Sequence, residues 1–562
     1  MVSTILVTGA TGTVGGEVAR QLRAEGAEVR ALSRSSSPGA DLREPASLPL
    51  DGVGSVFLVW PFATAEGARE VIEAIAGRAR RVVYLSSAAV RDHEREVERL
   101  IEESGLEWTV LRPHAFAANT LRWARQVRAG VVRGAHGPAA MPLIHERDVA
   151  AVAVRALLDD GHHGAVHELT GPEPITQADQ VRVISEITGL PARWLEVSPE
   201  HTRAELLATG WPPQAVDGIL QAQHDLVTRP APVTGTVEEV TKSAPSTFGE
   251  WVAEHAARFR TAPTPVAPTT MRAARIHEYG DATVIRQDRI PVPRPGPGEV
   301  LIEVAATSLN PAEVGLRLGL LHDVLQVNLP LTLGWDVSGT VVETGAGVTR
   351  LAPGDRVFGQ VTGAAAEYAT APADLLARAP ETVPLAHAAA VPVAGLTAWQ
   401  AIHEHARLTE GQRVLINGAG GGIGMFAVQL AKRAGAVVTA TAGPHSAAAA
   451  ARYGADEVID YATRPFPGGM DVVLNLAAIP DEAAAALAGR GRTVITVASP
   501  IEGGVHFITR NDPDQLAGIA ALIDRGELAV EVAAYRSPDE LQEVHRGAES
   551  GQLRGKTVVL MA

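Results

Sequence analysis

Two stretches of the chain share one pattern of apolar and polar positions. Residues 3–34 read as a short apolar run, a glycine-rich turn, an amphipathic helical segment and a second apolar run, and residues 412–443 repeat that order. Short apolar runs that alternate with amphipathic helices are typical of βαβ units in a parallel sheet. The pattern therefore predicts an α/β chain with two Rossmann-type, doubly wound parallel-sheet modules.

A proline-rich segment lies between the two stretches. Residues 261–270 read TAPTPVAPTT, without charge or apolar periodicity, which is the composition of a linker. Met271 then opens the second half. The alternative is a surface loop inside one large domain. Because each half has its own complete glycine-rich turn, we favour two modules joined by a linker.

Composition narrows the class of protein. The 562 residues are 46% hydrophobic with a net charge of −15, which suits several globular domains and disfavours nucleic acid or an anionic membrane as a partner. The absence of cysteine excludes disulfides and thiolate-bound metals. The opening MVSTILVTGATG lacks the basic region and cleavage site of a signal peptide. We expect a cytoplasmic protein with no nucleic-acid or membrane partner.

The first glycine-rich turn predicts a dinucleotide site. Gly9 allows a tight turn, Gly12 lets the backbone approach a pyrophosphate, and Gly15 allows the helix to pack closely on the strand. The phosphates then meet N–H groups at the helix N-terminus. The residues expected to hold the cofactor here are Gly9, Thr11, Gly12, Thr13, Val14 and Gly15.

The residue after the second apolar run bears on the choice of cofactor. This run ends in Ser33-Arg34, where an acidic residue would bind the ribose of NAD and an arginine can hold the 2′-phosphate of NADP. Arg34 therefore favours NADP(H), and the alternative is a solvated surface arginine.

The first half resembles the NmrA-like branch of the short-chain dehydrogenases/reductases. The resemblance rests on GATGTVG, DLREPASL, VVYLSSAA, EREVERLIEESGLEWTVLRPHAF and IHERDVAAVAV, and it covers about residues 1–260. It implies that a small substrate lobe follows the cofactor-binding part. It also implies that Asp41 and Leu42 border the adenine, Trp60 and Pro61 the ribose, and Ser86 the nicotinamide. Some members of this family reduce azo, quinone or iminium groups, and others only sense the redox state of the cofactor.

The usual catalytic pair of short-chain reductases is missing. That pair is Tyr-x-x-x-Lys, in which the tyrosine donates a proton. Tyr84 is followed four positions later by Ala88, so the pair cannot form there. His114, after Arg112-Pro113 at an expected strand end, is the best substitute donor, although a structural histidine is the alternative. The first half therefore reduces an acceptor that needs no dedicated acid, or it uses a substitute donor, or it is not catalytic.

The second glycine-rich turn spans residues 418–424. Gly418, Gly421 and Gly424 form the expected frame, and Gly422 and Ile423 offer amides to phosphate. The following run ends in TATAG, which includes Thr441 and no acidic residue, so NADPH is favoured and NADH is the alternative. No basic residue follows directly, and Arg452 is the candidate substitute.

The second half resembles the medium-chain reductases, and more narrowly the quinone oxidoreductase branch. The resemblance rests on LPLTLGWDVSGTVVETGAG, LAPGDRVFG, VAGLTAWQAI, RYGADEVIDY and RGKTVVL, and it spans about residues 271–562. It implies a β-rich GroES-like catalytic domain, residues 271–393 and 510–562, around a Rossmann domain, residues 394–509. It also implies a catalytic role for Asn310 and cofactor contacts for Thr397, Tyr461, Asn475, Val497 and Lys556.

The pattern of this half argues against zinc. Zinc-dependent relatives use cysteine and histidine ligands, whereas Ser308 and Trp335 stand at the matching positions. His403 and His405 are two residues apart on an expected helix and so do not share a face. We therefore expect no metal.

The leading hypothesis is an NADPH-dependent reductase with two cofactor sites. Its second half would transfer hydride to quinones or α,β-unsaturated carbonyls, small electrophilic molecules that need no metal to activate them. The alternative is a single-site reductase whose first half senses NADP(H) or acts as a scaffold. Both resemblances imply a homodimer.

Overall fold

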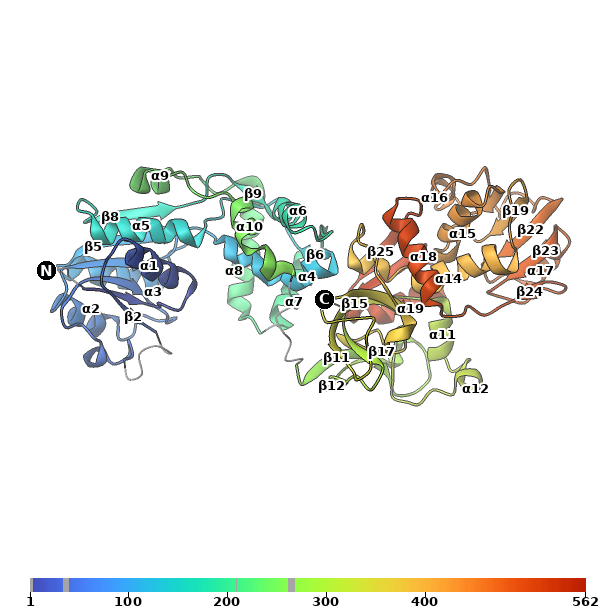
Figure 1. Cartoon of the computed structure of the whole chain (residues 1–562), viewed down its shortest axis with the longest axis horizontal. Helices are drawn as coiled ribbons and strands as arrows, with labels where there is room; N and C mark the ends of the chain where they lie inside the picture. The colour runs from blue at the N-terminus through green and yellow to red at the C-terminus, as the bar shows by residue number, and fades with distance from the viewer. Residues whose placement is uncertain (1–3, 34–39, 209, 261–267, 562) are drawn as a thin grey trace. The chain divides into compact units, whose positions relative to one another are not determined.

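The computed structural model describes residues 4–33, 40–208, 210–260 and 268–561. The chain divides into two compact units. The first contains Met1–Ala124, Val132–Gly189 and Trp194–Phe259, and the second contains Arg125–Val131, Leu190–Arg193 and Arg260–Ala562. Figure 1 labels the elements of both units.

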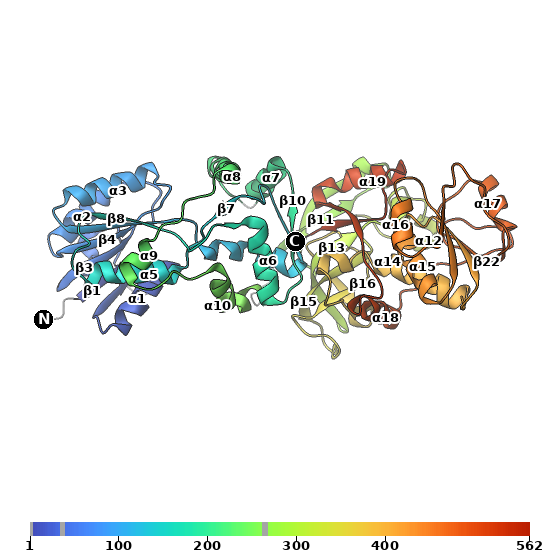
Figure 2. The ribbon, with the colours of Figure 1, turned by 90° about the horizontal axis from the view of Figure 1, so that it is seen from above.

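The first unit is built on a six-stranded parallel sheet in the order β2-β1-β3-β4-β5-β8. Figure 2 shows helices α2 and α3 on one side of this sheet and α1 and α5 on the other. Two buried apolar clusters fill the two sides, so the sheet is doubly wound as expected. The strands are β1 (Thr4–Thr8), β2 (Val29–Leu32), β3 (Val53–Val59), β4 (Arg81–Leu85), β5 (Glu107–Pro113) and β8 (Ala165–Leu169). The helices are α1 (Thr13–Ala24), α2 (Ala68–Ala76), α3 (Asp92–Glu103) and α5 (Glu146–Leu158).

Shorter elements follow the sheet. Segment η2 (Ala117–Trp123) and helix α4 (Ala124–Ala129) come after β5. Two strand pairs are small, β6 (Val131–Gly134) with β10 (Arg193–Glu196) and β7 (Ala140–Met141) with β9 (Ile175–Thr176). The remaining helices are α6 (Gln177–Thr188), α7 (Pro199–Ala208), α8 (Pro213–Thr228), α9 (Thr236–Thr241) and α10 (Phe248–Arg260).

The second unit contains a β-rich part. Its larger sheet has the order β18-β16-β15-β13-β26-β25, with β17 also paired to β13, and a smaller sheet has the order β12-β11-β14. The strands are β11 (Thr270–Ile276), β12 (Ile285–Pro291), β13 (Glu299–Ser308), β14 (Leu331–Thr332), β15 (Asp336–Thr344), β16 (Arg356–Gln360), β17 (Tyr368–Pro372), β18 (Leu376–Arg378), β25 (Val532–Arg536) and β26 (Lys556–Leu560). Helices α11 (Pro311–Arg317), α12 (His322–Leu325), α13 (Leu385–Ala388) and α19 (Leu541–Glu549) belong to the same stretches of chain.

The second unit also contains a six-stranded parallel sheet in the order β21-β20-β19-β22-β23-β24. The strands are β19 (Arg413–Asn417), β20 (Val437–Thr441), β21 (Glu457–Ile459), β22 (Met470–Asn475), β23 (Gly491–Thr496) and β24 (Val505–His506). Helices α14 (Pro392–Trp399), α15 (Gly422–Arg433), α16 (Ala447–Arg452), α17 (Asp481–Ala488) and α18 (Pro513–Asp524) accompany it.

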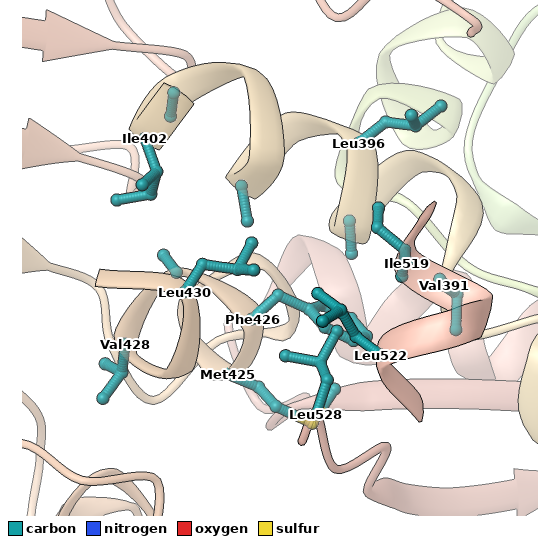
Figure 3. Packing of buried hydrophobic residues seen from close by; sticks show 14 of the residues in the cluster. Val391, Leu396, Ile402, Met425, Phe426, Val428, Leu430, Ile519, Leu522 and Leu528 are labelled. Atoms are coloured by element: carbon teal, nitrogen blue, oxygen red, sulfur yellow. The ribbon is translucent and has the colours of Figure 1, made fainter. Parts of the chain in front are cut away.

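The core beside this sheet joins α15 to α14 and α18. Figure 3 shows Phe426 of α15 beside Leu522 of α18, and Leu430 of α15, Leu396 of α14 and Ile519 of α18 belong to the same buried cluster. Helix α18 lies in residues 510–562, the stretch expected to belong to the GroES-like domain, yet its apolar face lies in the Rossmann core. That stretch therefore contributes to both parts, since its strands β25 and β26 join the β-rich sheet.

The two parallel sheets differ in strand order. The second has the order typical of dinucleotide-binding folds, with two strands outside β19 on one side, whereas the first has only β2 outside β1 among the described residues. Ligands bind such sheets at the carboxyl ends of the strands where the order reverses, which is between β1 and β3 and between β19 and β22. Both glycine-rich turns lie at these points.

Two local expectations need adjustment. The expected linker, 261–270, falls largely outside the described residues, and β11 already begins at Thr270. The segment Gln400–His405, expected to be an ordinary helix, is a π-helical turn that continues α14. Among the described helices, none combines the length and apolar character needed to cross a membrane.

Candidate active sites

The first glycine-rich turn has the close packing that its sequence predicts. Gly9 has a φ of 63°, in the left-handed region that favours glycine. A Cβ atom added to Gly15 would lie 2.4 Å from the Gly9 carbonyl oxygen, so helix α1 can approach the strand only with glycine at that position. The Gly12 N–H donates to the Gly9 carbonyl at 2.8 Å and closes the turn.

The second turn repeats this geometry. Gly418 has a φ of 88°, and a Cβ added to Gly424 would lie 2.5 Å from the Gly418 carbonyl oxygen. The Gly421 N–H donates to the same carbonyl at 3.1 Å. The two turns are therefore equivalent position by position.

Both helices begin with open backbone N–H groups. Helix α1 starts after Gly12 and α15 after Gly421, and neither has a side-chain cap. No described residue accepts from the first three N–H groups of either helix, which are those of Thr13, Val14 and Gly15 and of Gly422, Ile423 and Gly424. Uncapped N–H groups at a helix N-terminus attract phosphate. Each turn fits the pyrophosphate of a nicotinamide dinucleotide.

The residues expected around the adenosine in the first half are only partly described. Arg34 lies outside the described residues. Asp41 is exposed and accepts from the Arg43 N–H at 2.9 Å. Trp60 is buried and donates its indole N–H to the Thr64 carbonyl at 2.8 Å, so this N–H is not free for a ligand. Exposed Pro61 and half-buried Leu42 lie beside these residues in sequence.

Thr11 and Val14 of the first turn differ in exposure. Thr11 is exposed at the tip of the turn. Val14 is buried in the core beneath α1, so it offers a ligand its backbone N–H and not its side chain.

Ser86 follows β4 and takes part in a polar network. Its hydroxyl donates to Glu98 of α3 at 2.6 Å, and the Arg112 guanidinium donates to the same carboxylate, with Nε at 3.1 Å. Glu98 and Ser86 are both buried. The hydrogen bond to Glu98 raises the pKa of Arg112, so this guanidinium stays charged.

His114 follows β5 and lies against Glu168 of β8. Its Nε2 is 2.6 Å from the Glu168 carboxylate. Tyr84, by contrast, is fully buried in the sheet, and burial raises its pKa well above the usual value. Tyr84 therefore cannot take the place of the missing catalytic tyrosine, because it lies in the core.

Asp336 is the centre of the polar cluster in the second unit. One carboxylate oxygen accepts from the Val393 N–H at 2.9 Å, beside the start of α14. The other accepts from Asn310 Nδ2 at 2.8 Å, from Lys556 Nζ at 3.1 Å and from the Ser308 hydroxyl. Asp336 is fully buried, so one carboxylate organises the ends of β13, β15 and β26 and the start of α14.

Asn310 and Lys556 use their polar atoms within this cluster. The Lys556 ammonium donates to Asp336, to Asn310 Oδ1 at 2.9 Å and to the Leu309 carbonyl at 3.3 Å, which occupies all of its donors. The Lys556 stem lies against the second turn, because a Cβ on Gly422 would be 2.6 Å from its Cδ. Lys556 therefore reaches the cofactor turn with its methylene groups, while its charge faces Asn310 and Asp336.

Glu313 lies buried beneath Asn310. It accepts from the Asn310 N–H at 3.1 Å and from the Gly334 N–H at 3.1 Å. Burial, with the charge of nearby Asp336, raises the pKa of Glu313 to about 8. Glu313 is therefore largely protonated at neutral pH. Asp336 is then the one charged carboxylate of the cluster, and the Lys556 ammonium balances its charge.

Asn475 lies beside the second turn, whereas the hydrogen-bond partners of Thr397 are Val393 and Thr509. The Thr397 hydroxyl donates to the Val393 carbonyl and lies 2.6 Å from the Thr509 hydroxyl. Asn475, at the end of β22, accepts from Asn417 at 2.8 Å, and its buried Nδ2 has no acceptor among the described residues. That orphaned donor beside the turn fits a site that a ligand completes.

Thr441, Val497 and Tyr461 lie around the same turn. The Thr441 hydroxyl donates to Asn417 at 2.6 Å and accepts from the Gly418 N–H at 3.3 Å, so it stabilises the turn from inside the protein. Half-buried Val497 packs on the Rossmann core. Tyr461 is 60% exposed, and its hydroxyl is 3.5 Å from a Cβ added to Gly443.

Arg452 is engaged away from the turn. It forms an ion pair with Glu531 at 3.1 Å, and the Tyr453 hydroxyl donates to the same carboxylate at 2.6 Å. In this arrangement Arg452 is held by Glu531, and a 2′-phosphate would have to compete with that carboxylate for it.

The comparisons with known families divide the chain in the same way as the two turns. Residues 5–52 match the NAD dependent epimerase/dehydratase family. Residues 296–381 match the alcohol dehydrogenase GroES-like domain, and residues 453–559 match the family described as zinc-binding dehydrogenase.

Several curated relatives are named as reductases or oxidoreductases. A (4-alkanoyl-5-oxo-2,5-dihydrofuran-3-yl)methyl phosphate reductase of Streptomyces griseus is 38% identical over 45% of this chain and 99% of its own. An NAD(P)H azoreductase of Xenophilus azovorans is 31% identical over 46% of this chain and 100% of its own. The chloroplast envelope quinone oxidoreductase homolog of Arabidopsis thaliana is 39% identical over 35% of this chain and 63% of its own.

The chain is a fusion of an NmrA-like short-chain and a quinone oxidoreductase-type medium-chain dehydrogenase/reductase. It is an oxidoreductase that uses a nicotinamide cofactor. Among solved structures, the quinone oxidoreductase from Coxiella burnetii is 29% identical with a TM-score of 0.49 and covers 52% of this chain and 99% of its own.

The medium-chain half carries a family description that mentions zinc, although the whole chain lacks cysteine. Within the described residues, no three histidine or acidic side chains come together as metal ligands would. His403 lies against the Trp399 ring at 4.5 Å and His405 against the Phe507 ring at 4.1 Å, so the two histidines have different neighbours.

Several residues of both polar clusters were not predicted. In the short-chain half these are Glu98, Arg112 and Glu168, and in the medium-chain half they are Glu313, Asp336 and Thr509. One signal could have found Arg112, because Tyr84 and Ser86 on one strand and Arg112 and His114 on the next alternate onto one face of a sheet. Glu98, Glu168 and Asp336 come from other elements, and spacing along the chain does not reveal them.

Proposed function

We propose that the chain is an NADPH-dependent reductase with two sites. The medium-chain half transfers hydride to quinones or α,β-unsaturated carbonyls, and the short-chain half is a second reductase. The observation that carries this proposal is the pair of equivalent, uncapped helix starts at Gly12 and Gly421. In this reading Asn310, His114 and the cofactor residues named from the sequence form the two sites.

In the medium-chain half, the protein orients the reactants and supplies no acid of its own. Bound NADPH provides the hydride. Asn310 and Lys556 have no donor left over, because the Asn310 amide donates to Asp336 and Glu313 and the Lys556 ammonium donates to Asp336, Asn310 and the Leu309 carbonyl. The acceptor oxygen then takes its proton from solvent. Electrophilic acceptors such as enones and quinones suit a site that works by orientation.

NADPH is the proposed cofactor in both halves. In the short-chain half, Arg34 follows β2 where a 2′-phosphate would lie. In the medium-chain half, no acidic residue follows β20, so nothing there favours the ribose hydroxyls of NADH. NADH is the alternative for the medium-chain half, because Arg452 is already paired with Glu531.

The proposal includes an arrangement of domains. We assign residues 1–260 to the short-chain domain, 261–270 to a linker, 271–393 and 510–562 to the GroES-like domain and 394–509 to the Rossmann domain. A homodimer and a cytoplasmic location are part of the same proposal and rest on the family resemblances and on composition.

A second candidate function has its own support. The short-chain half lacks the Tyr-x-x-x-Lys pair, and its Tyr84 is buried in the core. A domain that binds NADP(H) without turnover, as a sensor or scaffold, would need no proton donor. The medium-chain half would then be the only enzyme in the chain.

Full-length variants that close one turn at a time separate these functions. A Cβ added to Gly421 meets only the Gly418 carbonyl, at 3.4 Å, and one on Gly12 meets only the Gly9 carbonyl, at 3.2 Å. Gly421→Val and Gly12→Val should therefore fold and block the phosphate approach. NADPH oxidation is measured for both variants against a panel of quinones and enones.

Each result has a clear meaning. We expect each variant to keep turnover on part of the panel and the double variant to have none. If Gly421→Val alone abolishes all turnover while still binding NADPH, the short-chain half is a sensor or scaffold. If neither variant changes turnover, the assignment of both sites is wrong.

A further inference from the structure

The carboxyl edge of the first sheet carries a line of polar side chains of alternating charge. Ser86 follows β4, Arg112 and His114 lie at the end of β5, and Glu168 lies on β8. Arg112 and Glu168 are direct partners in the parallel register of β5 and β8. Because side chains alternate along a strand, Arg112, His114 and Glu168 project from the same face, the one covered by α3.

Hydrogen bonds tie this line together. Ser86 donates to Glu98 at 2.6 Å, Arg112 donates to both Glu98 oxygens, and His114 Nε2 lies 2.6 Å from Glu168. The order along the line is Glu98, Arg112, Glu168 and then His114. The line thus alternates carboxylates with nitrogen-bearing side chains.

This line of polar side chains lies at the edge of the sheet where open α/β folds bind their ligands. It lies at the carboxyl ends of the strands, the same edge as the turn of Gly9 and Gly12. The backbone continues the sheet there, since the Ala88 N–H donates to the Pro113 carbonyl and the His114 N–H to the Leu169 carbonyl. His114 is therefore fixed by its backbone as well as by Glu168.

We propose that His114 is the proton donor of the short-chain site and that Glu168 is the residue that positions it. This inference rests on the proposed reductase function of the short-chain half. Glu168 takes the N–H of Nε2, so the transferable proton is on Nδ1, to which no described residue is bonded. The histidine–carboxylate pair then does the work of the missing tyrosine and lysine.

The step balances in atoms and charge. The acceptor receives hydride from NADPH at its electrophilic carbon or nitrogen, and negative charge develops on the neighbouring atom. The Nδ1–H bond of the His114 imidazolium breaks as a new bond to hydrogen forms on that atom. The imidazole left behind is neutral, still donates Nε2–H to Glu168, and regains its proton from solvent. This division of roles between a histidine and the carboxylate behind it is a general one.

Arg112 and Glu98 complete the surroundings of the pair. Arg112 lies beside Glu168 on the neighbouring strand, and its guanidinium is held by Glu98, so the Glu168 carboxylate stays with His114. The charged groups that face His114 are thus Glu168 from β8, Arg112 from its own strand and, through Arg112, Glu98 from α3. Ser86 gives its proton to Glu98 and presents only lone pairs to a ligand.

The test uses the full chain with Gly421→Val, so that turnover comes from the short-chain site alone. His114→Gln and Glu168→Gln are made in that background. The matched control is Glu254→Gln, because Glu254 also lies on a histidine Nε2, that of His145 at 3.1 Å, with a similar exposure of 45% against 49% for Glu168. The measurements are kcat, KM for NADPH and the pH–rate profile.

We expect His114→Gln to lower kcat by roughly 10²–10⁴-fold, the usual contribution of a general acid, with little change in KM for NADPH. Glu168→Gln should lower kcat less than His114→Gln and leave KM for NADPH unchanged, because Glu168 orients the imidazole and does not touch the cofactor. Glu254→Gln should leave both kcat and KM unchanged. A merely structural role for Glu168 would not lower kcat selectively while KM for NADPH stays the same.

Two results would overturn the inference in different ways. If His114→Gln and Glu168→Gln turn over like their parent at every pH, the pair is only structural, although the short-chain half remains a reductase. If Gly421→Val has no turnover with any acceptor, the proposed second reductase site fails, and this inference fails with it.

Discussion

Lys556 and Asp336 form an ion pair across 3.1 Å in which both side chains are buried. The pair joins β26 to β15, and Asn310 lies between the two charges, accepting from one and donating to the other. Buried charges of this kind cost several kcal/mol to desolvate, so each needs its partner. The pair thus fixes the geometry of the site, but it adds little to the net stability of the fold because the cost of desolvation offsets the attraction.

Removing one partner of this ion pair should destabilise the second unit far more than removing both partners. We expect Asp336→Asn or Lys556→Met alone to lower the free energy of unfolding of this unit by about 3–5 kcal/mol, because the remaining charge is left unpaired. The double variant should recover a large part of that loss, measured by urea unfolding.

The control for this cycle is Glu457→Gln. Glu457 pairs with Arg464, and the two side chains are 48% and 58% exposed. An exposed pair contributes about 0–1 kcal/mol. Equal effects of Glu457→Gln and Asp336→Asn would contradict the importance of burial.

Because the pKa of Glu313 is raised, the free energy of unfolding should fall as the pH rises, the opposite of what a paired carboxylate does. Its pKa is raised to about 8 in the folded state, so the folded chain holds a proton that the unfolded chain loses above about 4.5. Stability should therefore fall as pH rises from about 4.5 to about 8, by up to about 5 kcal/mol, and level off beyond. Glu313→Gln should remove this slope, measured as urea midpoints across the pH range.

An aspartate in the same unit provides the comparison. Asp512 has a lowered pKa, because the Gln515 N–H donates to its carboxylate. Asp512→Asn should remove a contribution that is lost only as pH falls through the acid range. A slope between pH 5 and 8 that survives Glu313→Gln would assign the effect to another group.

His145 should add a slope near neutral pH in the first unit. Burial alone would lower its pKa, but hydrogen bonds to Glu146 and Glu254 outweigh burial and raise it. The folded state thus binds the proton more tightly, and this stabilisation is fully present below pH 6.5 and is lost as pH rises through the raised value. His145→Gln should reduce the change in the free energy of unfolding with pH in that window, measured by urea unfolding at several pH values. An unchanged pH dependence would exclude the effect.

The close approach at Gly15 should distinguish two glycine substitutions in helices. A Cβ on Gly15 would lie 2.4 Å from the Gly9 carbonyl oxygen, whereas one on Gly218 in α8 meets nothing within 4 Å. We expect Gly15→Ala to destabilise the first unit by about 1–3 kcal/mol, as overpacking does. Gly218→Ala should stabilise it by about 0.4–1 kcal/mol through lower chain entropy and better helix propensity. Thermal unfolding of the two variants gives the comparison.

The features that depend on neighbours in sequence could be predicted from the amino-acid sequence alone. Both glycine-rich turns, the helices after them and the division into a short-chain and a medium-chain half follow from short-range patterns. The positions of Gly9, Gly15, Gly418 and Gly424 are decided by backbone angles and by contacts within a few residues. Such features depend on neighbours in sequence, and a pattern of residue types records them.

Strand order and the polar clusters needed the tertiary structure. The first sheet places β3 beside β1, although its local pattern is the same as that of the second. Lys556 meets Asn310 across 246 residues of chain, and His114 meets Glu168 across 54. Which carboxylate meets which cation depends on how strands from distant stretches lie side by side, and no local periodicity encodes that choice. Sequence patterns thus locate the two cofactor turns, while tertiary packing decides which groups surround them. The physical reason is that a buried charge needs a partner within hydrogen-bond distance, and only the fold determines which residues come that close.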